Sequence, residues 1–143
     1  MKGWLLDTNV ISELRKLRCH IGVKTWADKQ SPISMYLSTV TMAEIRFGIE
    51  QLPDETRRST LSSWLDSELR PWFAGRILAV DEEVILEWCR MVARGRSVRH
   101  TFSQPDLFIA ATASVHNLCV VTRNVKDFQV AGASVVDPWN HSP

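Results

Sequence analysis

Acidic side chains stand at the ends of apolar segments in three separate parts of this sequence. Asp7 directly follows the apolar run 4–6, Glu44 lies shortly after the run 35–38, and Asp106 opens a predicted helix. Carboxylates brought together repel one another, so a group of three is costly without a cation. Magnesium prefers oxygen ligands and is often held by one or two carboxylates directly. Such an ion lowers the pKa of a bound water and polarises a phosphoryl oxygen, so these acids are candidates for phosphodiester hydrolysis.

The alternation of short apolar strands with helices predicts that these acids meet at one edge of a sheet. We expect strands at 4–6, 35–38, 76–80, 118–122 and 134–136. The helices expected between them span 10–17, 21–29, 42–52, 54–69, 81–93 and 105–115, and a turn is expected around position 124. Short apolar strands that alternate with helices are typical of a parallel sheet covered on both faces. The functional crevice of such a sheet lies beyond the carboxyl ends of its strands.

A local explanation competes with metal binding for each acid. Thr41 and Glu44 match a capping box, in which the Glu side chain reaches back to the backbone N–H of the cap residue. Ser103 and Asp106 match a broader form of the same pattern, with a proline in the first turn. Asp7 could simply cap the helix that follows it. Spacing alone leaves both explanations open for all three acids.

The composition is that of an ordinary globular protein. The 143 residues include 17 Lys and Arg against 16 Asp and Glu, with 45% hydrophobic and 23% charged residues. We therefore expect one domain over residues 1–143, with no staple needed for folding. No apolar run approaches the ~20 residues of a membrane span, and the acid at position 7 interrupts any leader-like stretch, so a cytoplasmic protein without membrane contact is expected. The three scattered cysteines are expected to be reduced thiols.

Four segments carry a more specific signal, because they occur in one order. They are Leu5-Leu6-Asp7-Thr8-Asn9-Val10-Ile11-Ser12-Glu13-Leu14, the stretch from Leu37-Ser38 through Thr41-Met42-Ala43-Glu44-Ile45-Arg46-Phe47-Gly48-Ile49, Asp106-Leu107-Phe108-Ile109-Ala110-Ala111-Thr112-Ala113, and Val121-Thr122-Arg123-Asn124-Val125-Lys126-Asp127-Phe128. Together they resemble the PIN-domain ribonucleases. The likeness is greatest to the VapC/FitB-type toxins of bacterial toxin–antitoxin pairs, and it covers essentially the whole chain.

The resemblance implies a three-layer α/β/α sandwich with a central parallel sheet and a Mg²⁺- or Mn²⁺-dependent endoribonuclease. It places Asp7, Glu44 and Asp106 at the family's metal-site positions, and we expect the three to lie within a few ångströms and share a cation. Asn124 stands where the family often has a fourth acid. Its neutral carbonyl oxygen can bind a metal weakly or hold a water, so weaker binding of any second metal is expected.

The same resemblance implies partners. They are an RNA substrate, a cognate antitoxin protein, a second copy of the chain in a homodimer, and DNA reached only through the antitoxin. The alternative function is a binding module with little turnover, acting with its antitoxin as an autorepressor. A phosphotransferase with Asp7 as nucleophile is disfavoured, because Asn9 stands where such enzymes usually have a second acid.

Residues around these positions carry further expectations. Thr8 and Thr122 are expected to hydrogen-bond to the acids. Asp127 could act through a water, although a local turn role is favoured. Trp64 and Trp88 are expected in the core or a dimer interface, with base stacking as the alternative. The candidates for RNA contact are the basic residues Arg94, Arg96, Arg99 and Arg123, and a solvated helix end is the alternative for the first three.

Overall fold

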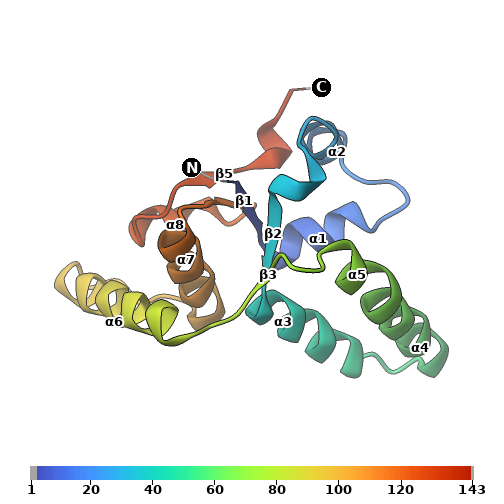
Figure 1. Ribbon diagram of the computed structural model, residues 1–143, viewed down its shortest axis with the longest axis horizontal. Helices are drawn as coiled ribbons and strands as arrows, with labels where there is room; N and C mark the ends of the chain where they lie inside the picture. Colours follow the sequence, from blue (N-terminus) through green and yellow to red (C-terminus); the bar gives the residue numbers. More distant parts are fainter. Residues whose placement is uncertain (1–2, 143) are drawn as a thin grey trace.

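The computed structural model describes residues 3–142 and has one parallel sheet with helices on both sides (Figure 1). Its strands are β1 (Trp4–Leu6), β2 (Met35–Ser38), β3 (Ile77–Leu78), β4 (Cys119–Val121) and β5 (Val135–Val136). They pair in the order β3-β2-β1-β4-β5, and every pairing is parallel. The expected fold class is therefore confirmed. Met1 and Lys2, which begin the predicted domain and the segment considered as a leader, and Pro143 lie outside the described residues.

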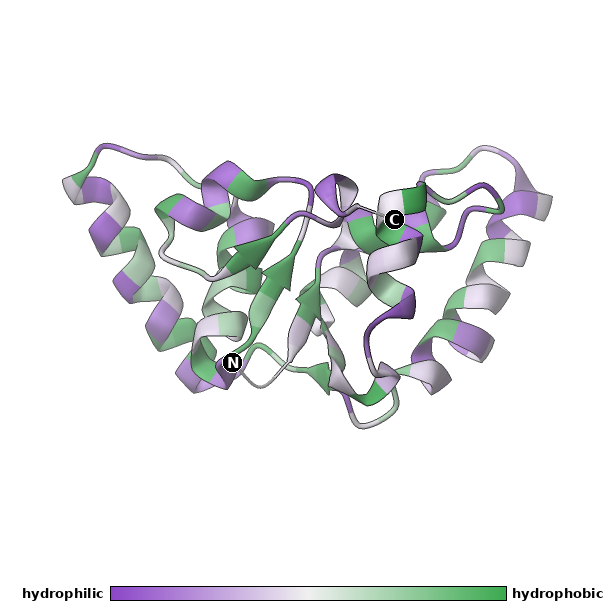
Figure 2. Ribbon diagram, turned by 90° about the horizontal axis from the view of Figure 1, so that it is seen from above, coloured by the Kyte–Doolittle hydropathy of each residue, from purple (hydrophilic) through white to green (hydrophobic). Residues whose placement is uncertain are grey.

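The helices divide between the two faces of the sheet. They are α1 (Thr8–Leu14), α2 (Ile21–Asp28), α3 (Thr39–Glu50), α4 (Glu55–Trp64), α5 (Arg70–Trp72), α6 (Glu82–Ser97), α7 (Gln104–His116) and α8 (Val125–Val130). Figure 1 shows α6, α7 and α8 on one side of the sheet, and α1, α2, α4 and α5 on the other. In Figure 2 the strands are green and lie between helices whose colours alternate, as expected for helices with one buried face. Every helix in the described part of the chain is too short or too polar to cross a membrane.

The core consists of two hydrophobic clusters separated by the sheet. Leu5 and Val120 belong to the cluster under α6 and α7, whereas their neighbours Leu6 and Val121 belong to the cluster under α1 and α2. Successive strand residues point to opposite faces, which is why β1 and β4 are apolar throughout. All four side chains are at most 1% exposed. The central strands are thus held rigidly, and so are the residues that follow them.

Several predicted boundaries are wrong, for local reasons. Helix α3 begins at Thr39 rather than near 42, because the Ser38 hydroxyl accepts a hydrogen bond from the backbone N–H of Val40 at 3.0 Å and caps the helix there. The helix expected over 54–69 continues through a π-helical turn (Leu65–Leu69) into α5. Helix α6 extends to Ser97, and the turn expected around position 124 contains α8. The first of these shifts matters for the site, since it moves Glu44 into the second turn of α3.

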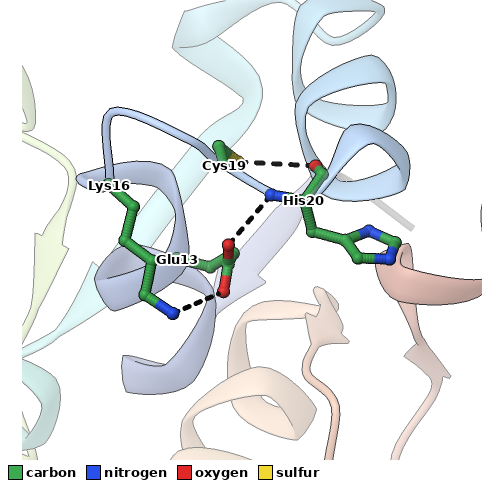
Figure 3. Close-up of polar contacts among 4 residues, drawn as sticks. All are labelled: Glu13, Lys16, Cys19 and His20. Atoms are coloured by element: carbon green, nitrogen blue, oxygen red, sulfur yellow. Dashed lines mark hydrogen bonds and ion pairs between the residues drawn. The ribbon is translucent and has the colours of Figure 1, made fainter.

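The loop between α1 and α2 is fastened by Glu13 (Figure 3). The backbone N–H of His20 donates to Oε2 of Glu13 at 2.9 Å, and Nζ of Lys16 donates to Oε1 at 3.1 Å. The His20 hydrogen bond is the larger cause that lowers the pKa of Glu13, and the Lys16 bond acts in the same direction. Nδ1 of His20 in turn accepts from the backbone N–H of Gly22 at 3.1 Å and starts α2. These contacts set where α1 ends, and Asp7 is the cap residue just before its start.

Candidate active site

Asp7 lies at the carboxyl end of β1, in the middle of the sheet. Its backbone N–H donates to the carbonyl of Val121 at 2.9 Å, which continues the ladder between β1 and β4. Its Oδ1 accepts from the backbone N–H of Thr8 at 2.8 Å, and its Oδ2 accepts from Oγ1 of Thr122 at 2.8 Å. Asp7 therefore does cap α1, as one interpretation of the sequence predicted. The second oxygen points away from the helix toward β4, so capping leaves part of the carboxylate available.

Burial disfavours the charged form of this carboxylate. Asp7 is only 4% exposed. Removal from water raises its pKa, while the hydrogen bonds from Thr122 and Thr8 lower it in part. Within residues 3–142 no Lys, Arg or His forms a salt bridge with Asp7. A buried anion held only by neutral donors is a place where a cation would stabilise the charged form.

Glu44 approaches this carboxylate from α3. Its Oε1 accepts a hydrogen bond from Oγ1 of Thr8 at 2.8 Å. The capping box with Thr41 is not formed, because the cap of α3 is Ser38. Burial raises the pKa of Glu44 most, the Thr8 bond lowers it, and the charge of Asp7 raises it further. Glu44 is thus oriented by the residue next to Asp7 rather than by its own helix terminus.

Asp106 reaches the site from the first turn of α7. The expected capping pattern is absent, since Ser103 caps α7 without a side-chain hydrogen bond. Oδ2 of Asp106 instead accepts from Nδ2 of Asn124 at 2.9 Å. Burial, together with the charges of Asp7 and Glu44, raises the pKa of Asp106 to about 6. The three acids are therefore close enough to disturb one another's ionisation.

An unbroken chain of hydrogen bonds connects the three acids. The hydroxyl of Thr122 completes it, because the backbone N–H of Asn124 donates to Oγ1 of Thr122 at 3.0 Å. The expected hydrogen bonds from Thr8 and Thr122 to the acids are present. The members of this chain, which we call the acid network, are Glu44, Thr8, Asp7, Thr122, Asn124 and Asp106.

Asn9 strengthens the acid network, a role that the sequence analysis missed. Its Nδ2 donates to Oγ1 of Thr122 at 3.2 Å and, more weakly, to Oδ2 of Asp7 at 3.4 Å. Its Oδ1 accepts from the backbone N–H of Arg123 at 3.3 Å. The side chain thereby ties the start of α1 to the end of β4. Its place two residues after a strand-end acid was the available signal, because Thr122 and Arg123 lie more than a hundred residues away.

The acids fit a hard divalent cation by their chemistry, although they do not form a finished metal site. Within residues 3–142 no three or more His, Cys, Asp or Glu side chains are arranged to hold a metal ion. Instead, hydroxyl and amide groups donate hydrogen bonds to the three acids. The candidate ligands are oxygen atoms, which Mg²⁺ prefers. Asp7, Glu44 and Asp106 form no salt bridge with any described residue, so their charge is uncompensated.

Asp127 does not occupy the local turn expected for it. It lies in the first turn of α8, with Oδ1 3.3 Å from Nε2 of His100. Its negative charge is one of the causes that raise the pKa of Asp106. Asp127 therefore acts on the site through its charge and connects α8 to the loop that precedes α7.

The basic residues predicted to contact RNA lie in different surroundings. Arg94 is paired with Glu87 at 3.2 Å, whereas Arg96 and Arg99 are exposed. Arg123 follows β4, and its guanidinium lies 5.2 Å from the centroid of the Trp139 ring. Arg123 is connected to the acid network through Asn9, whose Oδ1 accepts from the backbone N–H of Arg123 and whose Nδ2 donates to Thr122.

Comparisons with known proteins agree with this geometry. A PIN domain model matches residues 4–133. The VapC ribonuclease Y4jK of Sinorhizobium fredii is 37% identical over 135 residues, which cover 94% of this chain and 96% of the relative. The toxin FitB of Neisseria gonorrhoeae is 36% identical over 136 residues, which cover 95% of this chain and 98% of the relative.

Solved structures give the same assignment. The crystal structure of FitAcB from Neisseria gonorrhoeae superposes with a TM-score of 0.91 at 36% identity, covering 96% of this chain and 99% of that one. This chain belongs to the PIN-domain family.

Proposed function

We propose that this chain is the toxin of a toxin–antitoxin pair and cleaves RNA as an endoribonuclease that depends on a divalent metal ion. The acid network carries the proposal: three carboxylates from distant parts of the chain meet without a basic partner. Relatives at 37% and 36% identity are named a ribonuclease and a toxin. Their matches extend over nearly the full length of both chains, which supports transfer of the activity.

Asp7, Asp106 and Glu44 would hold the ion. When bound, Mg²⁺ or Mn²⁺ would polarise the phosphoryl group and lower the pKa of a coordinated water. Thr122 and Thr8 hold the two oxygens of Asp7 in fixed directions. Glu44 is half-buried with a raised pKa, and the oxygen that Thr8 does not engage is suited to take a proton from the attacking water.

Asn124 holds Asp106 through its amide nitrogen, which leaves the amide oxygen for a ligand or a water. Because the amide is neutral, it adds no attraction for a second cation. We therefore infer that one metal ion is sufficient for the reaction.

The partners of the complex follow from the same relatives. The structure of FitAB bound to the IR36 DNA fragment matches this chain with a TM-score of 0.90 at 34% identity, covering 98% of each chain. We propose that this chain likewise binds a cognate antitoxin, forms a homodimer, and reaches DNA only through the antitoxin. Such a complex works in the cytoplasm, where its RNA substrate is.

The test is cleavage of a structured RNA by the purified chain with Mg²⁺, with Mn²⁺ and with EDTA. Asp7→Asn and Asp106→Asn should abolish cleavage without unfolding the protein, and Asp28→Asn is the matched control. Asp28 is an exposed acid on α2 that pairs only with Lys24 at 2.8 Å. Cleavage at the unaltered rate by either site variant would contradict the assignment.

A second function has two observations in its favour. The acids are not preassembled as a metal site, and position 124 carries no charge. A chain with little turnover would act with its antitoxin as a DNA-binding autorepressor. The free chain separates the two functions: metal-dependent RNA cleavage supports the nuclease, and promoter binding by the complex without any cleavage supports the repressor.

A further inference from the structure

A groove leads away from the acid network between α1, α3 and α4. It has a volume of about 310 Å³, and two members of the acid network, Thr8 and Glu44, line it. Arg15, Arg57 and Trp64 also line it, and they come from the end of α1 and from α4. The volume is within the range of sites that bind small molecules. A ligand in this groove would therefore touch both the acid network and the two arginines.

The charges of these two arginines are not neutralised by the protein. Within the described residues, neither Arg15 nor Arg57 forms a salt bridge, whereas Arg46 pairs with Asp66 at 2.5 Å. The Arg15 guanidinium instead lies 5.7 Å from the centroid of the Trp64 ring. Contact with an aromatic face orients a guanidinium but leaves its positive charge available to an anion.

The charge distribution identifies the class of ligand. The part of the groove at Glu44 is acidic and repels phosphate, so a nucleic acid near it needs compensating cations. Arginine forms bidentate hydrogen bonds with phosphate oxygens. Apolar residues of α3 and α4, Ile45 and Leu61, also line the groove and suit a ribose or a base. An RNA strand combines these features, with anionic phosphates on a partly apolar chain.

We propose that this groove binds the stretch of RNA next to the scissile phosphate, with Arg15 and Arg57 contacting its phosphates. The proposal rests on the proposed endoribonuclease function and adds the path of the substrate. It places the main phosphate contacts on the α1–α4 side of the sheet, away from Arg94, Arg96 and Arg99 on the α6 side.

The experiment separates RNA binding from cleavage. Binding of a single-stranded oligouridine is measured by fluorescence anisotropy in EDTA over a series of salt concentrations, for Arg15→Gln, Arg57→Gln and the double variant. Each single variant should bind several-fold more weakly, with a salt slope about 0.7 smaller for each lost phosphate contact. With Mg²⁺, KM for RNA should rise and kcat should stay close to that of the unaltered chain. Arg15→Lys, which keeps the charge, should retain the salt slope.

Two further variants make the result specific. Arg90→Gln is the matched control, because Arg90 lies on α6 with 59% of its side chain exposed. Gly48→Leu tests the space itself: Gly48 lines the groove, and a Cβ at this position meets nothing within 4 Å. The Cβ of the new leucine therefore has room in the groove, and leucine has a higher helix propensity than glycine. Gly48→Leu should weaken RNA binding while thermal stability stays equal or increases.

The outcomes distinguish this proposal from the proposed function. If the unaltered chain cleaves no RNA with either metal, the proposed endoribonuclease function is overturned. The binding measurements in EDTA still test whether the groove binds RNA. If the unaltered chain cleaves RNA and the Arg15, Arg57 and Gly48 variants bind it as well as Arg90→Gln does, the groove proposal is overturned. It is also overturned if these variants lose affinity for the antitoxin but not for RNA, because the groove then serves a protein partner.

Discussion

Replacing Asp106 by Asn should stabilise the metal-free fold while abolishing cleavage. The substitution keeps the shape of the side chain, and its amide oxygen can still accept the hydrogen bond from Asn124. It removes the negative charge that burial and the neighbouring Asp7, Glu44 and Asp127 all disfavour. The chain therefore tolerates this acid at a cost in stability.

The size of the effect follows from the pKa. Burial and repulsion raise the pKa of Asp106 from 3.8 to about 6. One pKa unit corresponds to about 1.4 kcal/mol, so ionisation above pH 7 would cost the folded state about 3 kcal/mol without screening. Asp106 is only about half-buried, and solvent screens its charge, so we expect about 1 kcal/mol to remain. For a chain of this length that is an increase in Tm of about 3 °C.

The direction of the pKa shift of Asp106 also predicts how the stability of the fold depends on pH. Because the folded-state pKa is raised, Asp106 favours folding while it is protonated, and this contribution is lost as the pH rises through about 6. Asp7 and Glu44 have raised pKa values as well, so they act in the same direction. The unaltered chain in EDTA should therefore be more stable at pH 5 than at pH 7.5, and Asp106→Asn should reduce the difference.

Urea unfolding in EDTA at the two pH values measures both effects, with Asp28→Asn as the control for loss of an exposed acid. Adding Mg²⁺ at pH 7.5 should stabilise the unaltered chain more than the variant, since binding to the folded state alone raises stability. If Asp106→Asn is less stable than the unaltered chain at pH 7.5, or if its stability depends on pH in the same way, then Asp106 is not repelled by Asp7, Glu44 and Asp127.

Two other substitutions test neighbouring members of the acid network. Thr122→Val preserves the shape of the side chain but removes the hydroxyl that donates to Asp7, so RNA cleavage should fall about 10- to 100-fold at a fixed Mg²⁺ concentration; unchanged kinetics would show that Thr122 has no positioning role. Asn124→Asp adds a charge next to Asp106, so it should lower the Tm in EDTA and increase the stabilisation by Mg²⁺ in a thermal titration; a higher Tm in EDTA would contradict this interpretation.

The strand ends were predictable from sequence because the sheet is parallel and its strands are short. Short apolar runs with no polar alternation are typical of strands buried on both faces, and Asp7 directly follows one of them. The start of α3 was not predictable in the same way. Ser38 and Thr41 are both good cap residues, and only the β2 ladder decides that Ser38 is the last strand residue and therefore the cap.

The hydrogen bonds of the acid network lie beyond the reach of sequence patterns. Thr8 and Glu44 are 36 residues apart, and Asn124 and Asp106 are 18 residues apart. Each pairing depends on how two helices meet at the sheet edge and on the rotamers chosen there. Helix α8 was missed for a related reason: its six residues are too few for a clear period, and its buried Phe128 supplies the anchor.

The choice of neutral donors around the acids has a physical reason. A lysine or arginine paired with Asp7 would lower its pKa and stabilise the fold, but it would also occupy the position that a cation needs. Threonine and asparagine fix the direction of the carboxylate oxygens without neutralising their negative charge. The cost is a fold that is less stable at neutral pH until a cation binds. Within the described residues, neither of the two groove arginines, Arg15 and Arg57, forms a salt bridge with Asp7, Glu44 or Asp106, so they can hold phosphate without neutralising these carboxylates.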